Sequence, residues 1–163
     1  MKKYLCLACL LLAVMTAAGK KHRLDINRTC EVKIVRVAQE GTKLVKAWAT
    51  AGSVDKAIEQ AKLDAVAACL FHGVPANENS DEILPVCLHG TADYEKNKEY
   101  FDRFFDKEEF LNYVSQVTSR YPTGQDNVKV GGDHRVGVNL VVKYTALRQM
   151  LERDGIQRSL DSF

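Results

Sequence analysis

The sequence contains little proline or tryptophan and no marked excess of either charge. It has 3 prolines and 1 tryptophan in 163 residues, with 23 Lys and Arg against 21 Asp and Glu. A general nucleic-acid-binding protein carries a basic excess on one face, so the balanced charge excludes that class. It also excludes strong electrostatic recruitment to an anionic membrane. The composition, 46% hydrophobic and 27% charged, is that of an ordinary globular protein.

Long apolar runs are absent after residue 18, and the run before it is short. Lys2 and Lys3 precede an uncharged, mostly apolar stretch that ends in small residues at Ala18. This arrangement is typical of an export signal, and the stretch is shorter than the roughly 20 residues of a membrane span. We expect cleavage near Ala18 and an exported mature protein that either stays at the envelope or leaves the cell, with a membrane anchor as the alternative.

The chain after the expected signal is long enough for one domain with a hydrophobic core. Removing Lys2 and Lys3 lowers the number of Lys and Arg from 23 to 21, which equals the number of Asp and Glu. The mature chain is therefore close to neutral. We expect a polar leader at residues 19–28, a single domain at residues 29–156 and a short tail at residues 157–163.

Residues 43–73 are the centre of the expected fold. The pattern predicts a strand over residues 43–51 and, after a turn at Gly52, a helix that Ser53 caps and Gly73 ends. One side of the strand and one stripe of the helix carry small or apolar residues, so we expect these two faces to bury each other. The residues concerned are Val45, Ala47, Ala49 and Ala51 on the strand, and Val54, Ala57, Ile58, Ala61, Ala65, Ala68 and Cys69 on the helix.

The ends of the domain predict further strands and a last helix. Alternating residues indicate a strand over residues 29–38, with an irregularity at residues 35–37, that pairs antiparallel with the strand at 43–51. A hairpin is expected around Gly131 and Gly132, followed by an amphipathic helix. The two strands of the hairpin are predicted over residues 128–130 and 135–144, and the helix over residues 145–153.

The middle of the chain is less regular. An aromatic helix is expected within residues 94–105, and Asp106 is expected to cap a new helical start with Glu109 completing the capping box. Residues 110–121 fit both a helix and a strand, and their Val, Thr and Tyr content favours a strand over residues 112–120. Together the elements predict an α+β fold, an antiparallel sheet of about four to five strands with two main helices packed on one face.

Three cysteines remain after removal of the expected signal. A disulfide between Cys69 and Cys87 is the preferred interpretation, because it would fasten the long loop after the helix to the helix end. Unpaired thiols are the alternative. The two cysteines also occur near His72 and His89, whose side chains suit zinc, but the spacing matches no familiar zinc framework. We therefore expect no metal site.

No motif in the chain indicates catalysis. No small-residue elbow surrounds a candidate nucleophile, and Gly131-Gly132 is too short for a phosphate-binding loop. We expect a protein that is not an enzyme and that holds no cofactor.

Exposed aromatic residues are the best candidates for partner binding. Trp48 is expected on the opposite side of its strand from the alanines, where it either fills a second small core or marks an interaction surface. Tyr100 and Phe101 belong to the expected aromatic helix and are candidates as well. The expected partners are other envelope proteins. The alternative is a small-molecule or metal binder that uses the irregular residues 74–97 as a lid over the sheet.

The order of these motifs resembles a small bacterial cell-envelope domain. The likeness consists of a strand that ends in Ala51-Gly52, the alanine-rich helix, and the run Arg135-Val-Gly-Val-Asn-Leu-Val-Val. The run continues into Ala146-Leu147-Arg148 and Leu151-Glu152. That domain occurs in outer-membrane-associated lipoproteins and in the N-terminal part of a flagellar assembly protein. The resemblance covers residues 29–156 and implies a periplasmic location, no enzymatic activity and a role in assembling or stabilising envelope complexes. The chain lacks the lipidated cysteine of the lipoproteins.

Overall fold

The computed structural model describes residues 24–36, 38–118 and 121–158, and the expected export signal lies outside them. In these residues an antiparallel sheet has the strand order β1-β2-β5-β3, and β4 also pairs with β5. The strands are β1 (Glu31–Arg36), β2 (Lys43–Ala51), β3 (Val114–Gln116), β4 (Asn127–Val130) and β5 (Asp133–Val142). The helices are α1 (Val54–Ala67), α2 (Thr91–Lys96), α3 (Lys98–Asp106) and α4 (Tyr144–Arg153). A π-helical turn η1 (Ala68–His72) continues α1, and 3-10 turns η2 (Glu109–Tyr113) and η3 (Gly124–Asp126) precede β3 and β4. The predicted α+β class is confirmed.

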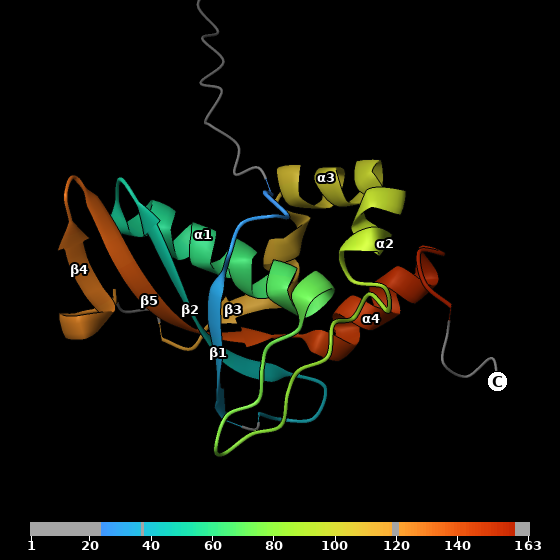
Figure 1. Cartoon of the computed structure of the whole chain (residues 1–163), viewed down its shortest axis with the longest axis horizontal. Coiled ribbons are helices and arrows are strands. Elements are labelled where there is room, and N and C mark those ends of the chain that lie inside the picture. Colours follow the sequence, from blue (N-terminus) through green and yellow to red (C-terminus); the bar gives the residue numbers. More distant parts are fainter. Residues whose placement is uncertain (1–23, 37, 119–120, 159–163) are drawn as a thin grey trace, which may run out of the picture.

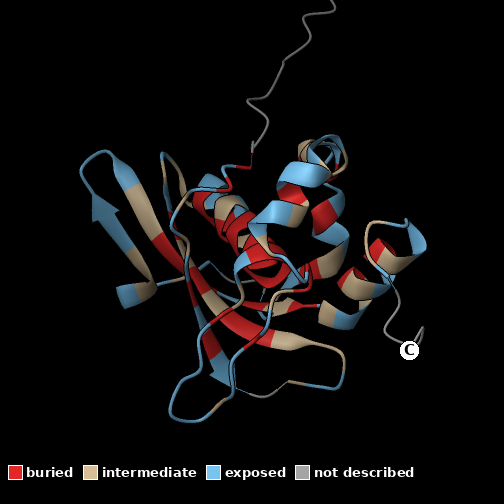
Figure 2. Ribbon diagram, turned by 45° about the vertical axis from the view of Figure 1, so that its right-hand side comes forward, coloured by how far each residue is buried: buried red, intermediate tan, exposed pale blue. Residues whose placement is uncertain are grey.

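Helix α1 packs on β2 and β5 through side chains that are mostly small (Figure 1). Ala47 on β2 and Ala57, Ala61 and Ala65 on α1 are fully buried, so the helix and the sheet lie close together as predicted. The Ser53 hydroxyl accepts a hydrogen bond from the Lys56 amide, which caps the first turn of the helix. Figure 2 shows that α1 is buried along most of its length, whereas β4 is exposed.

The predicted strand irregularity and hairpin are both confirmed. The pairing register of β1 and β2 shifts between Ile34 and Arg36, as the broken alternation indicated. Strands β4 and β5 meet at a tight turn of Gly131 and Gly132, and the hairpin forms the left-hand end of the molecule in Figure 1. The inward residues of β5 alternate along the strand and are Val136, Val138, Leu140 and Val142.

Two expectations for the middle of the chain are wrong in detail. Asp106 is the last residue of α3 and caps no new helix, because Glu108 adopts a left-handed conformation (φ 58°) and breaks the helical path. Of the strand expected over residues 112–120, the described part, residues 112–118, contains only the three residues of β3 as strand. Phe110 explains the late start of β3, since its buried ring lies 5.6 Å from that of Phe105 and holds η2 against α3.

The polar leader predicted for residues 19–28 is also corrected where the structure describes it. Leu24 and Ile26 are only 7% and 8% exposed, so they belong to the hydrophobic core. The packed domain therefore includes residues 24–28. The two apolar side chains, two positions apart, form a buried face, which the polar residues around them make hard to recognise in the sequence.

Residues 74–90 form a loop that hydrogen bonds hold in place and that runs beside β1 (Figure 1). Val74 and Ile83 exchange two backbone hydrogen bonds of 2.8 Å, and the Asn77 side-chain amide donates to the Ile34 carbonyl of β1. At the start of the loop Gly73 has φ 72° and ψ 177°, a conformation that is essentially restricted to glycine. A Cβ atom on Gly73 would lie 2.6 Å from the Ile83 carbonyl oxygen.

Gly73→Ala should therefore destabilise the protein by about 2–3 kcal/mol, because strain and a backbone clash act together. Gly131→Ala is the matched control, since Gly131 also has a positive φ (63°) but no atom within 4 Å of the added Cβ. It should cost only about 1 kcal/mol. Urea unfolding followed by circular dichroism measures both changes, and equal losses for the two variants would contradict the contact at Gly73.

Candidate functional site

The two faces of the sheet differ in burial. Val45, Ala47, Val136 and Val138 face α1 and are buried, as are the other inward residues of β2 and β5. The opposite face is largely exposed or half-buried. Trp48, the single tryptophan of the sequence, lies on this second face, as its position opposite the alanines predicted, and it is half-buried.

Gly137 allows the Trp48 indole to lie on the backbone of β5. The two residues are direct partners in the β2–β5 register. A Cβ atom on residue 137 would lie only 2.6 Å from Nε1 of Trp48 and 3.0 Å from Oδ1 of Asp126. A glycine that is covered by an aromatic side chain of the neighbouring strand pins the strand register. The indole is therefore fixed in place on a rigid element.

Three cations surround the Trp48 ring. The Nζ atoms of Lys46 and Lys33 lie 5.0 Å and 5.4 Å from the ring centroid, and the guanidinium carbon of Arg135 lies 5.9 Å from it. Each distance is within the range of a cation–π interaction. The cations come from β1, β2 and β5, which are neighbours in the sheet.

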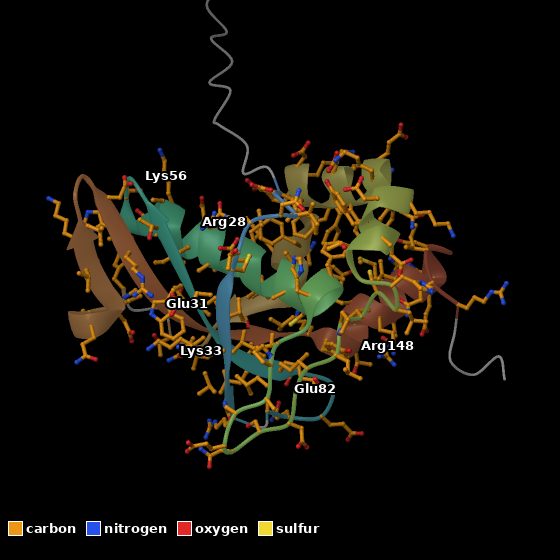
Figure 3. All side chains as sticks on the ribbon, in the orientation of Figure 1. Arg28, Glu31, Lys33, Lys56, Glu82 and Arg148 are labelled. Atoms are coloured by element: carbon orange, nitrogen blue, oxygen red, sulfur yellow. The ribbon has the colours of Figure 1, made fainter. Side chains whose placement is uncertain are left out.

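Two carboxylates hold these cations in position. Glu31 accepts from Arg135 and lies 3.8 Å from the Lys33 ammonium group, and Asp126 from η3 lies 2.6 Å from that of Lys46. Glu31 and Lys33 lie on β1 (Figure 3). We call this group the Trp48 surface; it consists of Glu31, Lys33, Lys46, Trp48, Asp126 and Arg135. Its side chains stack and pair charges, and none of these six residues is a nucleophile beside a base.

The other two predicted aromatic residues occupy different positions. Phe101 is fully buried, with its ring 4.8 Å from that of Phe71, so it is a core residue and the expectation of partner binding is corrected. Tyr100 is half-buried, and its hydroxyl donates a 2.7 Å hydrogen bond to Asp154. Tyr100 thus links α3 to the end of α4, and its role in partner binding stays a prediction.

The preferred disulfide is not formed, because Cys69 and Cys87 are separate free thiols, and Cys30 is free as well. Backbone hydrogen bonds fasten the loop to the helix end in its place, from the Val86 amide to the Cys69 carbonyl and from the Cys87 amide to the Leu70 carbonyl. The described residues contain no group of three or more His, Cys, Asp or Glu side chains that could hold a metal ion.

Sequence reasoning missed one polar group beneath the surface. Asp64 on α1 is the only polar or charged residue that is buried among the described ones. Its Oδ1 accepts from the Gln60 side chain at 2.8 Å, and its Oδ2 lies 3.3 Å from the Arg28 guanidinium. The signal in the sequence is that this aspartate stands between Leu63 and Ala65 in the alanine-rich helix, at a position where a buried side chain is expected.

A cleft borders residues 80–83, which belong to the segment that the alternative hypothesis uses as a lid. It measures about 470 Å³ and lies between residues 80–83, the turn that joins β1 to β2, and Tyr144. The hydrogen bonds of Val74 and Ile83 fasten this segment, so it forms a fixed wall of the cleft. Both polar and apolar groups line the cleft, and they do not converge on one ligand chemistry.

Gly137→Ala should displace the indole and lower the free energy of unfolding by about 1–3 kcal/mol, as overpacking does. Because Trp48 is the single tryptophan, the emission maximum of intrinsic fluorescence should move to longer wavelength as the ring becomes more exposed. Gly132→Ala is the control, since its added Cβ meets no atom within 4 Å. An unchanged emission spectrum in Gly137→Ala would contradict the packing described.

The thiol chemistry gives a second test. Burial raises the pKa of Cys69 and of Cys87 to about 12, and burial together with Asp64 raises the pKa of Cys30 to about 12. Since the thiolate is the reactive form, native mature protein should react slowly with Ellman's reagent at neutral pH. Denatured, unreduced protein should give the absorbance expected for three reacted thiols, whereas a Cys69–Cys87 disulfide would leave only one thiol able to react.

No helix among the described residues is long and apolar enough to cross a membrane. No family model matches the chain, and neither a curated protein nor a solved structure does. The functional proposal therefore rests on one structural observation, the Trp48 surface, and on the expectation of an export signal from the sequence.

Proposed function

We propose that this is an exported, non-enzymatic envelope protein that helps to assemble or stabilise a cell-envelope protein complex by binding another protein through the Trp48 surface. The observation that carries the proposal is a half-buried indole fixed among three cations on the sheet face opposite α1. The export signal expected at residues 1–18 and the resemblance to an envelope domain support the location.

The composition of the Trp48 surface favours a protein partner. Tryptophan and arginine are enriched among the residues that contribute most to protein–protein affinity, and such residues lie at the centre of a contact. Trp48 lies centrally, with Arg135 on one neighbouring strand and Lys33 on the other. Neighbouring exposed apolar side chains, Val128 and Val130 on β4, extend the surface past Arg135.

The charge of the Trp48 surface favours an acidic partner. It contains three cations, whereas Glu31 and Asp126 supply two negative charges, so one positive charge is in excess. The rest of the mature chain is close to neutral, so the excess is local. Complementary charge increases the association rate and selects among partners more than it adds to affinity. Binding should therefore weaken as salt concentration rises.

The Trp48 surface is also pre-organised for binding. Its side chains come from three paired strands and from η3, and its charged groups are already held by ion pairs, so little side-chain freedom is lost when a partner binds. Trp48 and Arg135 lie outside the buried core, and their replacement removes surface contacts while α1 and its contacts stay in place.

The proposal predicts a partner whose affinity depends on Trp48. Native mass spectrometry of the mature protein from its own envelope should show a complex heavier than the monomer, and its mass identifies the partner. With that partner purified, Trp48→Ala should weaken binding about 30-fold, and Arg135→Gln about tenfold with a reduced salt dependence.

Leu88→Ala is the matched control, because Leu88 is 61% exposed and lies in the loop after η1, outside the Trp48 surface. It should leave the affinity unchanged. A complex that contains only copies of this chain would contradict the proposal, and so would equal affinities for the wild type and Trp48→Ala.

A further inference from the structure

A cleft of about 430 Å³ lies between the N-terminal segment of residues 24–30 and the π-helical turn η1. Its walls are apolar at Ile26, Val32 and Pro75, and its basic groups are Arg28 and His72. None of the described residues that line it carries a carboxylate. The volume suits a small ligand, and the lining suits an anion with an apolar part.

The buried carboxylate of Asp64 lies beside the Arg28 side chain. The Asp64 side chain is 2% exposed, whereas that of Arg28 is 36% exposed and borders the cleft. Oδ2 of Asp64 is buried and makes no hydrogen bond, although the guanidinium lies 3.3 Å away. The contact therefore lacks hydrogen-bond alignment, and a buried carboxylate oxygen without a hydrogen bond is unfavourable. Figure 3 shows Arg28 beside α1, near the start of β1.

The burial of Asp64 also changes its affinity for protons. Burial raises the pKa of this carboxyl group above its usual value, and the hydrogen bond from Gln60 and the charge of Arg28 offset only part of the effect. Asp64 thus accepts a proton more readily than an exposed aspartate. A neutral Asp64 would leave the guanidinium of Arg28 available for another anion.

We propose that the cleft between the N-terminal segment and η1 binds a small carboxylate with a short apolar tail. Arg28 leaves Asp64 to pair with the carboxylate of the ligand, and Asp64 takes up a proton from solvent. A guanidinium matches a carboxylate in a planar, two-point contact, and the ligand's carboxylate can reach this geometry where Asp64 does not. The apolar tail lies against Ile26, Val32 and Pro75.

The groups around Asp64 set the pH dependence. Arg28 and Cys30 face it from the N-terminal segment, with Asp25 beside Cys30, and Gln60 faces it from α1. Cys30 stays protonated, because burial raises its pKa to about 12. Since ligand binding takes up a proton, affinity is highest at a pH below the raised pKa of Asp64 and falls as pH rises through it.

Hexanoate is the probe, with hexanamide as its uncharged match. Each is titrated into the mature chain between about pH 5.5 and about pH 8 by calorimetry in buffers of different ionisation enthalpy, which counts the protons taken up. Hexanoate should saturate a single site with a Kd on the order of 1 mM. Arg28→Gln should weaken hexanoate binding at least about tenfold. Hexanamide should bind the wild type about as weakly as hexanoate binds this variant.

The Asp64→Asn variant tests the exchange itself. It should abolish proton uptake and tighten hexanoate binding about fivefold or more at the upper pH, because the competing carboxylate is gone. Histidines change charge in the same pH range, so His72→Gln is the control and should retain proton uptake. Arg28→Lys keeps the charge without the planar fork and should bind several-fold more weakly than wild type.

Several results would overturn the inference. These are the absence of saturation below about 10 mM hexanoate, equal affinity in Arg28→Gln, and proton uptake that persists in Asp64→Asn or is lost in His72→Gln. The cleft shares no residue with the Trp48 surface. Failure here therefore leaves the proposed protein contact untouched, and hexanoate binding in Trp48→Ala distinguishes the two sites directly.

Discussion

The close contact between the alanines of α1 and those of β2 is the constraint on which the other features depend. Fully buried Ala57, Ala61 and Ala65 add little side-chain bulk between the helix and the sheet, so dispersion contacts act over a short separation. Because α1 occupies this face so closely, β2 can expose only its other side. The position of Trp48 on the open face follows directly from the packing of the alanines.

The open face combines features that stabilise a fold with features that suit recognition. Gly137 gives the indole a flat support, and the ion pairs of Arg135 and Lys46 restrain the cations around it. Exposed ion pairs contribute little to stability, about 0–1 kcal/mol each, so the pair of Arg135 and Glu31 adds little to the folding of this face. A rigid aromatic centre with a charged rim is the form that interfaces between proteins commonly take.

The N-terminal segment shows a different balance of forces. Leu24 and Ile26 bring this segment onto the core by burying apolar surface. Arg28 and Cys30 follow within a few residues, so the same docking encloses the Asp64 carboxylate. The hydrophobic gain of the segment thus offsets the electrostatic cost of a buried charge. The cleft beside η1 lies next to this polar group, which gives it chemistry that the cleft beside residues 80–83 lacks.

The sequence by itself determined the periodic elements and the side of each that is buried. The two-residue alternation of β5, the alanine stripe of α1 and the Gly131-Gly132 turn act over short distances, and the structure has them as predicted. Tertiary structure alone decided the rest, because contacts between distant segments outweigh local preference. Phe110 joined the aromatic cluster and shortened β3, and Phe101 became a core residue. Arg28 met Asp64 because the N-terminal segment packs beside α1. Arg135 met Glu31 at Trp48 through a sheet whose pairing brings residues 104 positions apart into contact.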